Sequence, residues 1–100
     1  MERFTILRTI EDTYLGKTLV DMLYSGVRNN DLTKDKAISI CNDFMNKQEM
    51  FNSYARVEME LILSDDNGNR TIIHRAERNH PKYDRQKVSD DDLNKNMRDK

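Results

Sequence analysis

The sequence predicts an α+β protein in which an antiparallel helical hairpin is followed by a β-hairpin and a polar C-terminal tail. Three patterns support this fold class: helical spacing of apolar residues over residues 13–51, alternation of apolar and polar residues over residues 54–63, and few large apolar residues after position 77. We therefore expect a helical hairpin at residues 1–52, a β-hairpin at 53–77 and an extended or disordered tail at 78–100.

The first helix is expected from Thr13 to Val27, after a short extended strand in MERFTILRT. Asp12 or Thr13 can cap its N-terminus, and Gly26 suits its C-terminus. Its apolar residues recur at intervals of three and four, which is the spacing of one helical face. This face comprises Leu15, Leu19, Met22, Leu23 and Val27.

The second helix is expected to begin after Thr33, which is a favourable N-cap, with Asp35 well placed in the first turn. Its apolar face comprises Ala37, Ile40, Cys41, Phe44 and Met45. Two helices joined by a short polar loop pack antiparallel. Their apolar faces either cover the chain's own β-hairpin or complete a four-helix bundle with a partner.

The β-hairpin is expected over Tyr54–Ala76. Apolar residues alternate with charged ones from Ala55 onward, which predicts a half-buried strand. Asn67-Gly68 is a strong hairpin turn signal, and a return strand follows it. The residues expected to face the interior of a small β-barrel or sheet are Val57, Met59, Leu61 and Ile73.

The composition favours a small protein that shares its core with a partner. Apolar residues make up 36% of the chain and charged residues 35%, and the apolar share is low for a globular domain. The formal net charge of −1 argues against a globally basic nucleic-acid binder. No apolar run is long enough to span a bilayer, so we expect a soluble, intracellular protein.

Chemistry-bearing residues show no catalytic or metal-binding spacing. The single cysteine, Cys41, is expected to be a small buried hydrophobe, and His74 and His80 are expected at the surface. The acidic residues at 65–66 fit a turn better than a calcium loop, and those at 90–92 fit a solvated tail or a helix cap. We therefore expect no enzyme activity, no metal and no cofactor.

A cluster of basic residues after the hairpin turn admits a second interpretation. With Tyr83 among them, these side chains could contact a phosphate backbone. Glu77 and Asp84 interrupt the cluster, so a solvated segment of mixed charge is the simpler explanation. The candidate nucleic-acid contacts are Arg70, Arg75, Arg78, Lys82, Arg85 and Lys87.

The first half of the chain resembles the small (gamma) subunit of the general transcription factor IIA. The residues that carry the resemblance are Thr13-x-Leu15-Gly16-x-Thr18-Leu19-x-Asp21-x-Leu23, then Leu32-Thr33, Ala37 and Phe44. The match covers about residues 4–51. The second half lacks the family's aromatic-rich strands, and the chain has no tryptophan.

This resemblance implies a subunit that heterodimerises with the larger transcription factor IIA subunit through a four-helix bundle. It further implies a β-barrel that contacts the TATA-binding protein on promoter DNA, and a nuclear location. The implied partner-binding residues are Leu15, Gly16, Leu19, Met22, Leu23, Ile40 and Phe44. A glycine at position 16 would let a partner's backbone approach closely.

Two alternatives remain beside this non-catalytic transcription-initiation subunit. The chain could be a small viral or phage regulator, cytoplasmic in that case, that binds and inhibits a host protein. It could also be a small nucleic-acid-binding protein that uses the basic cluster. In the first two interpretations the partner is a protein, and an obligate hetero-oligomer is expected.

Overall fold

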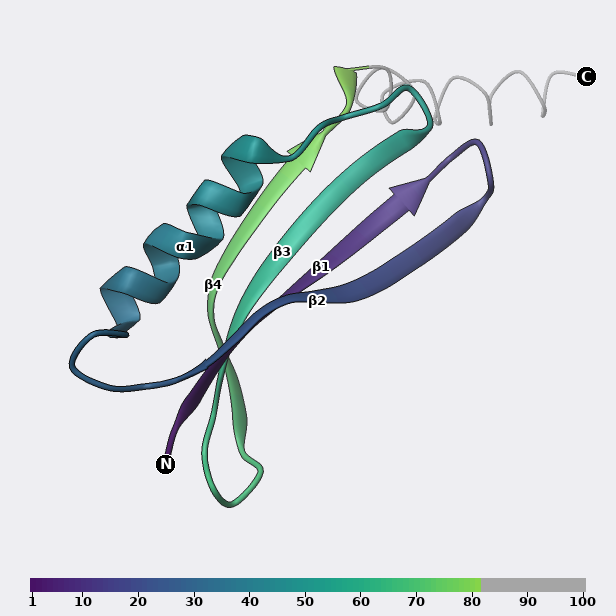
Figure 1. Ribbon diagram of the computed structural model, residues 1–100. Coiled ribbons are helices and arrows are strands. Elements are labelled where there is room, and N and C mark those ends of the chain that lie inside the picture. Colours follow the sequence, from purple (N-terminus) through teal and green to yellow (C-terminus); the bar gives the residue numbers. More distant parts are fainter. Residues whose placement is uncertain (82–100) are drawn as a thin grey trace, which may run out of the picture.

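Residues 1–81 are described by the computed structural model, and they form a four-stranded antiparallel sheet with one helix on one of its faces (Figure 1). The order of the strands across the sheet is β2-β1-β3-β4. The elements are β1 (Arg3–Asp12), β2 (Lys17–Val27), α1 (Lys34–Lys47), β3 (Tyr54–Ser64) and β4 (Arg70–Asn79). The N-terminal strand β1 therefore lies inside the sheet, between β2 and β3.

The helical hairpin expected at residues 1–52 is wrong. The segment Lys17–Val27, which was expected to be helical, is the edge strand β2 and pairs with β1. The described residues thus contain no pair of helices that could form half of a four-helix bundle. They also form no closed barrel, because the sheet is open and has β2 and β4 at its edges. The short strand expected at the N-terminus instead extends over ten residues, Arg3–Asp12.

A β-bulge interrupts the alternation of side chains along β2. The register opposite β1 pairs Leu7 with Met22 but Ile6 with Tyr24, so Leu23 is an extra residue. A bulge changes which alternate residues share a face. Leu19 and Tyr24 consequently lie on the same face of the sheet, and a strict period of two is lost.

Helix α1 (Lys34–Lys47) begins where the sequence predicts. The side chain of Thr33 accepts a hydrogen bond from the backbone N–H of Lys36, which is the capping contact that the sequence predicts. Its buried residues are Ala37, Cys41 and Met45, so the predicted apolar face is real even though its partner is a sheet.

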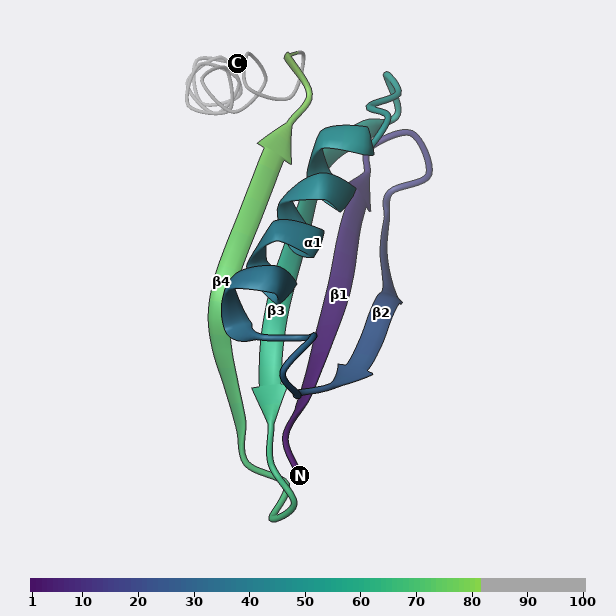
Figure 2. The same cartoon turned by 60° about the vertical axis from the view of Figure 1, so that its left-hand side comes forward.

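The core lies between α1 and one face of the sheet (Figure 2). Its strand residues come from β1 and β3 in alternation and include Phe4, Ile6, Val57, Met59 and Leu61, all of which are fully buried. The helix packs on β3 and β4, so it leaves the outer strand β2 largely uncovered. The apolar face of α1 therefore packs against the chain's own sheet.

Strands β3 and β4 form the hairpin expected around residues 54–76, now as part of the larger sheet. Gly68 has φ of +83°, a conformation that favours glycine in a turn. Asp65 holds the turn by accepting hydrogen bonds from the backbone N–H groups of Asn67 and Asn69. Val57, Met59 and Leu61 face the interior as predicted, and Ile73 packs partly buried against the same core.

Candidate interaction cleft

A cleft of about 310 Å³ lies between the C-terminal end of α1 and the part of the same sheet face that β1 and β2 form. It exists because α1 covers β3 and β4 rather than β2. Its lining combines apolar, aromatic and charged side chains from β1, β2, α1, the segment after α1 and β3. They are Arg8, Ile10, Leu23, Phe44, Lys47, Gln48, Glu49, Phe51, Tyr54 and Met59.

The polar wall of the cleft is organised around Arg8. Its guanidinium donates two hydrogen bonds to the carboxylate of Asp21, at 2.9 and 2.5 Å, and a third to Oε1 of Gln48 at 3.0 Å. The hydrogen bond with Asp21 raises the pKa of Arg8 above its ordinary value. Because these contacts join β1, β2 and the segment after α1, they fix the width of the cleft at this wall.

The apolar wall carries aromatic side chains that are incompletely covered. Phe51 is 51% exposed, and its ring meets the ring of Tyr54 edge to face, with centroids 5.2 Å apart. Phe44 of α1 is partly buried against the core, while Ile10 and Met59 are buried. The cleft is therefore apolar in its depth, with exposed aromatic carbon at its rim.

The structure collects some of the residues predicted to bind a partner. Leu23 and Phe44 line the cleft together, although they come from a strand and a helix. Leu19 pairs with the cleft residue Ile10 and is 50% exposed. Ile40 lies beside Phe44 on α1, where both line a second, smaller hollow of about 190 Å³.

Three further predicted positions lie elsewhere. Met22 pairs with Leu7, whose neighbours along β1 face the core, so Met22 points away from the cleft. Leu15 and Gly16 belong to the turn between β1 and β2. Gly16 has φ of +64°, and nothing lies within 4 Å of the position its Cβ would take, so the turn conformation explains this glycine better than a close packing contact does.

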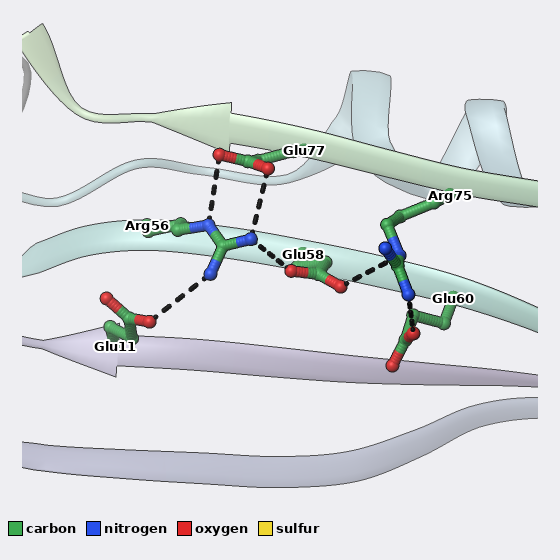
Figure 3. Close-up of polar contacts among 6 residues, drawn as sticks. All are labelled: Glu11, Arg56, Glu58, Glu60, Arg75 and Glu77. Atoms are coloured by element: carbon green, nitrogen blue, oxygen red, sulfur yellow. Dashed lines mark hydrogen bonds and ion pairs between the residues drawn. The ribbon is translucent and has the colours of Figure 1, made fainter.

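The face of the sheet opposite α1 carries an ionic network (Figure 3). Arg56 of β3 contacts Glu11 of β1, Glu77 of β4 and Glu58 of its own strand. These contacts, with the hydrogen bond from Arg56 to Glu77 as the largest cause, raise the pKa of Arg56. Arg75 extends the network through ion pairs to Glu58 and Glu60, so one arginine bridges three strands and the other bridges two.

The candidate nucleic-acid residues are dispersed. Arg75 is paired with glutamates of this network, while Arg78 donates to the backbone oxygen of Gln48. Arg70 lies near Arg3 at the other end of the sheet, where both line a separate hollow of about 380 Å³. Lys82, Arg85 and Lys87 lie outside the described residues. In the described part of the chain, the expected cluster is therefore divided among separate places.

The cysteine and His74 make contacts within the fold in the described region. Cys41 is fully buried, as expected, and burial raises the pKa of its thiol. His74 shares a hydrogen bond of 2.9 Å with Asn42 of α1. Within residues 1–81, no group of three or more histidine, cysteine or acidic side chains is arranged to hold a metal ion, and no helix is long and apolar enough to cross a membrane.

Comparisons with protein-family models, with curated proteins and with solved structures found no match to this chain. The cleft is therefore described from its volume and its lining residues alone. Sequence patterns missed Arg8, Gln48 and Tyr54, since these residues lie in three different segments whose proximity depends on the strand order. One sequence signal pointed to strand β2: Thr18 and Val20 are β-branched residues, which favour a strand over a helix.

Proposed function

We propose that this chain is a non-catalytic protein-binding module whose cleft accepts a bulky apolar side chain of a polypeptide partner. The observation that carries the proposal is the half-exposed ring of Phe51 beside a concave, apolar depth. Exposed aromatic side chains around a pocket are typical anchors at protein interfaces. The charged side chains at the rim would fix the orientation of the bound segment.

The size of the cleft favours a side chain over a larger ligand. A volume of about 310 Å³ lies at the lower end of small-molecule sites, and it suffices for one large aliphatic or aromatic group. The rim is close to electrically balanced, because Arg8 is paired with Asp21 and the cationic Lys47 is accompanied by the acidic Glu49. A balanced rim gives no preference for a polyanion such as nucleic acid.

Two more specific functions, a transcription-initiation subunit and a regulator of a host protein, differ in how well the fold supports them. Participation in transcription initiation, with a larger transcription factor IIA subunit and the TATA-binding protein as partners, was based on helices that the chain does not form at residues 13–27. The residue matches therefore lose their structural support. A regulator that binds a host protein requires no particular fold and agrees equally well with a cleft of this kind.

The proposal is tested by replacing Phe51 with lysine. The matched control is Ile72→Lys, because Ile72 is 48% exposed but lies on β4 and does not line the cleft. Tagged wild-type chain and both variants are incubated with extract of the source cells, and the captured polypeptides are quantified by mass spectrometry. We expect a specific set of polypeptides with wild type and Ile72→Lys, and its loss with Phe51→Lys.

The opposite results contradict the proposal. Capture that is unaffected by Phe51→Lys would place the interaction elsewhere, and absence of any specific polypeptide with wild type would remove the binding function. The identity of the captured chains then separates the finer predictions, since transcription-initiation proteins would support the first and unrelated host proteins the regulator. The location of a fluorescent fusion, nuclear or cytoplasmic, provides a separate check.

A further inference from the structure

The outer edge of β2 pairs with no other strand in the part of the chain that the structure describes, and β2 has exposed side chains on both of its faces. Within residues 1–81, no element lies beyond β2 in the sheet (Figure 2). All five residues of Lys17–Asp21 are exposed, including Leu19 at 50% and Val20 at 62%. A long edge strand that carries apolar side chains is a template for pairing with another strand.

We propose that β2 pairs antiparallel with β2 of a second copy of this chain, to give a continuous eight-stranded sheet. This inference goes beyond the cleft function, because it concerns a different surface and a different partner. Two identical strands related by a twofold axis perpendicular to the sheet pair residue by residue around a central position. The side chains at the β2 edge allow that central position to be identified.

Charge complementarity places Leu19 at the twofold axis. In this register Leu19 lies opposite Leu19 of the second copy, and Lys17 lies opposite Asp21 of the second copy, twice by symmetry. A shift in either direction places Asp21 opposite Leu19 or Leu15, and a further shift places Asp21 opposite itself. The first register is therefore the one that pairs opposite charges.

The neighbouring strands extend this complementarity. Within one copy, Arg8 of β1 lies opposite Asp21, and Asp12 of β1 lies opposite Lys17. In the dimer, four side chains therefore lie side by side across the strands: Arg8 and Asp21 of one copy, then Lys17 and Asp12 of the second copy. Their charges alternate in sign. Lys17 makes no ion pair with another described residue, so its ammonium group is available for this contact.

The opposite edge of the sheet is less suited to self-pairing. Strand β4 carries four basic or acidic side chains besides His74 in its sequence RTIIHRAERN. Charged side chains on an edge strand protect it from pairing with another sheet. In β2 the corresponding groups are Lys17 and Asp21, which are complementary in the proposed register.

The first experiment measures the mass of the full chain in solution by sedimentation equilibrium over a range of concentrations. We expect a monomer–dimer equilibrium in wild type, and a rise of about tenfold or more in the dissociation constant for Lys17→Glu, because two like-charge pairs then face each other. Lys36→Glu, a charge reversal at an exposed position on α1, is the matched control and leaves the equilibrium unchanged.

A mixing experiment tests the register. Lys17→Glu and Asp21→Lys chains are each expected to be monomeric, and an equimolar mixture is expected to form heterodimers because both cross-strand pairs become favourable again. Folding of each variant is verified by circular dichroism. Failure of two folded variants to associate on mixing would overturn the register, and a wild-type chain that is monomeric up to about 1 mM would overturn the dimer.

Cross-linking keeps the inference testable if a charge variant does not fold. In a Cys41→Ala background, Leu19→Cys is expected to form a disulfide-linked dimer on mild oxidation, since opposite residues have Cβ atoms about 4.5–5.5 Å apart. Met22→Cys, which lies off the twofold axis on the other face, is the control and is expected to remain monomeric. Efficient cross-linking of Met22→Cys without Leu19→Cys would contradict the proposed pairing.

Discussion

Arg8 and Asp21 form a two-point contact across β1 and β2, with Nε–Oδ1 and Nη2–Oδ2 distances of 2.9 and 2.5 Å. The two residues lie opposite each other in the strand register. Their side chains are 25% and 50% exposed, so water screens the pair in part. The contact therefore positions the polar wall of the cleft more than it stabilises the fold.

A double-mutant cycle with Arg8→Met and Asp21→Asn tests this interpretation. We expect a coupling free energy below about 1 kcal/mol in urea unfolding, because partly exposed ion pairs contribute little to stability. We also expect both single variants to weaken partner capture, since the guanidinium loses its fixed orientation. A coupling well above this range would instead assign the pair a major structural role.

Replacement of Arg56 with methionine is expected to be more damaging than replacement of Arg75. Arg56 is 25% exposed and contacts carboxylates from three strands, so its loss leaves Glu11, Glu58 and Glu77 facing one another without a cation. The expected loss of unfolding free energy is about 1–3 kcal/mol. Arg75 is 55% exposed, and Arg75→Met should cost less than about 1 kcal/mol. Equal losses in urea unfolding would contradict this ranking.

Gly26 is required because Leu32 occupies the space where a Cβ would lie. A Cβ at position 26 would be 2.7 Å from Cδ2 of Leu32 and 3.1 Å from the hydroxyl oxygen of Tyr24. Leu32 is buried, so it cannot move freely, and Gly26→Ala should cost about 1–3 kcal/mol. The control is the same substitution in a Leu32→Ala background, where most of this cost should disappear. Additive losses in thermal or urea unfolding would exclude the steric explanation.

The thiol of Cys41 should be unreactive in the folded chain and should make stability depend on alkaline pH. Burial raises its pKa above the ordinary value of 9.0, so the folded state keeps the proton after the unfolded chain has begun to lose it. This contribution to stability is complete below pH 9.0 and is lost as the pH rises toward the folded-state pKa. Alkylation by iodoacetamide should therefore require unfolding.

The Cys41→Ala variant provides the comparison. Its unfolding free energy should fall less between pH 8 and pH 10 than that of the wild type, because the variant has no thiol to ionise in the unfolded chain. Rapid alkylation of native protein at neutral pH, or identical pH dependence in both proteins, would show that the thiol is accessible to solvent.

The helix and the C-terminal hairpin could be predicted because their residues follow local rules. Thr33 caps α1, Cys41 lies on its buried face, and the turn at Asn67-Gly68 joins two alternating strands. Each of these features depends on neighbours within a few positions. Burial of Val57 and Met59 likewise follows from the alternation along β3.

Strand β2 could not be predicted by the same means. The extra residue Leu23 breaks the alternation, and the apolar residues Leu19 and Val20 lie on opposite faces of an uncovered edge strand. No single burial pattern marks such a strand, so the spacing resembled that of a helix. The cleft was missed for the same reason, because Arg8 and Phe51 become neighbours through the sheet order alone.

The central position of β1 has a consequence for folding during synthesis. Arg3 pairs with Ser64, and their sequence positions differ by 61. One edge of the first strand therefore stays uncovered until β3 has been synthesised. Contacts between distant residues slow folding, and an uncovered strand edge exposes a chain to aggregation. The local β1–β2 hairpin can form early on the ribosome, and the sheet is completed once β3 has emerged.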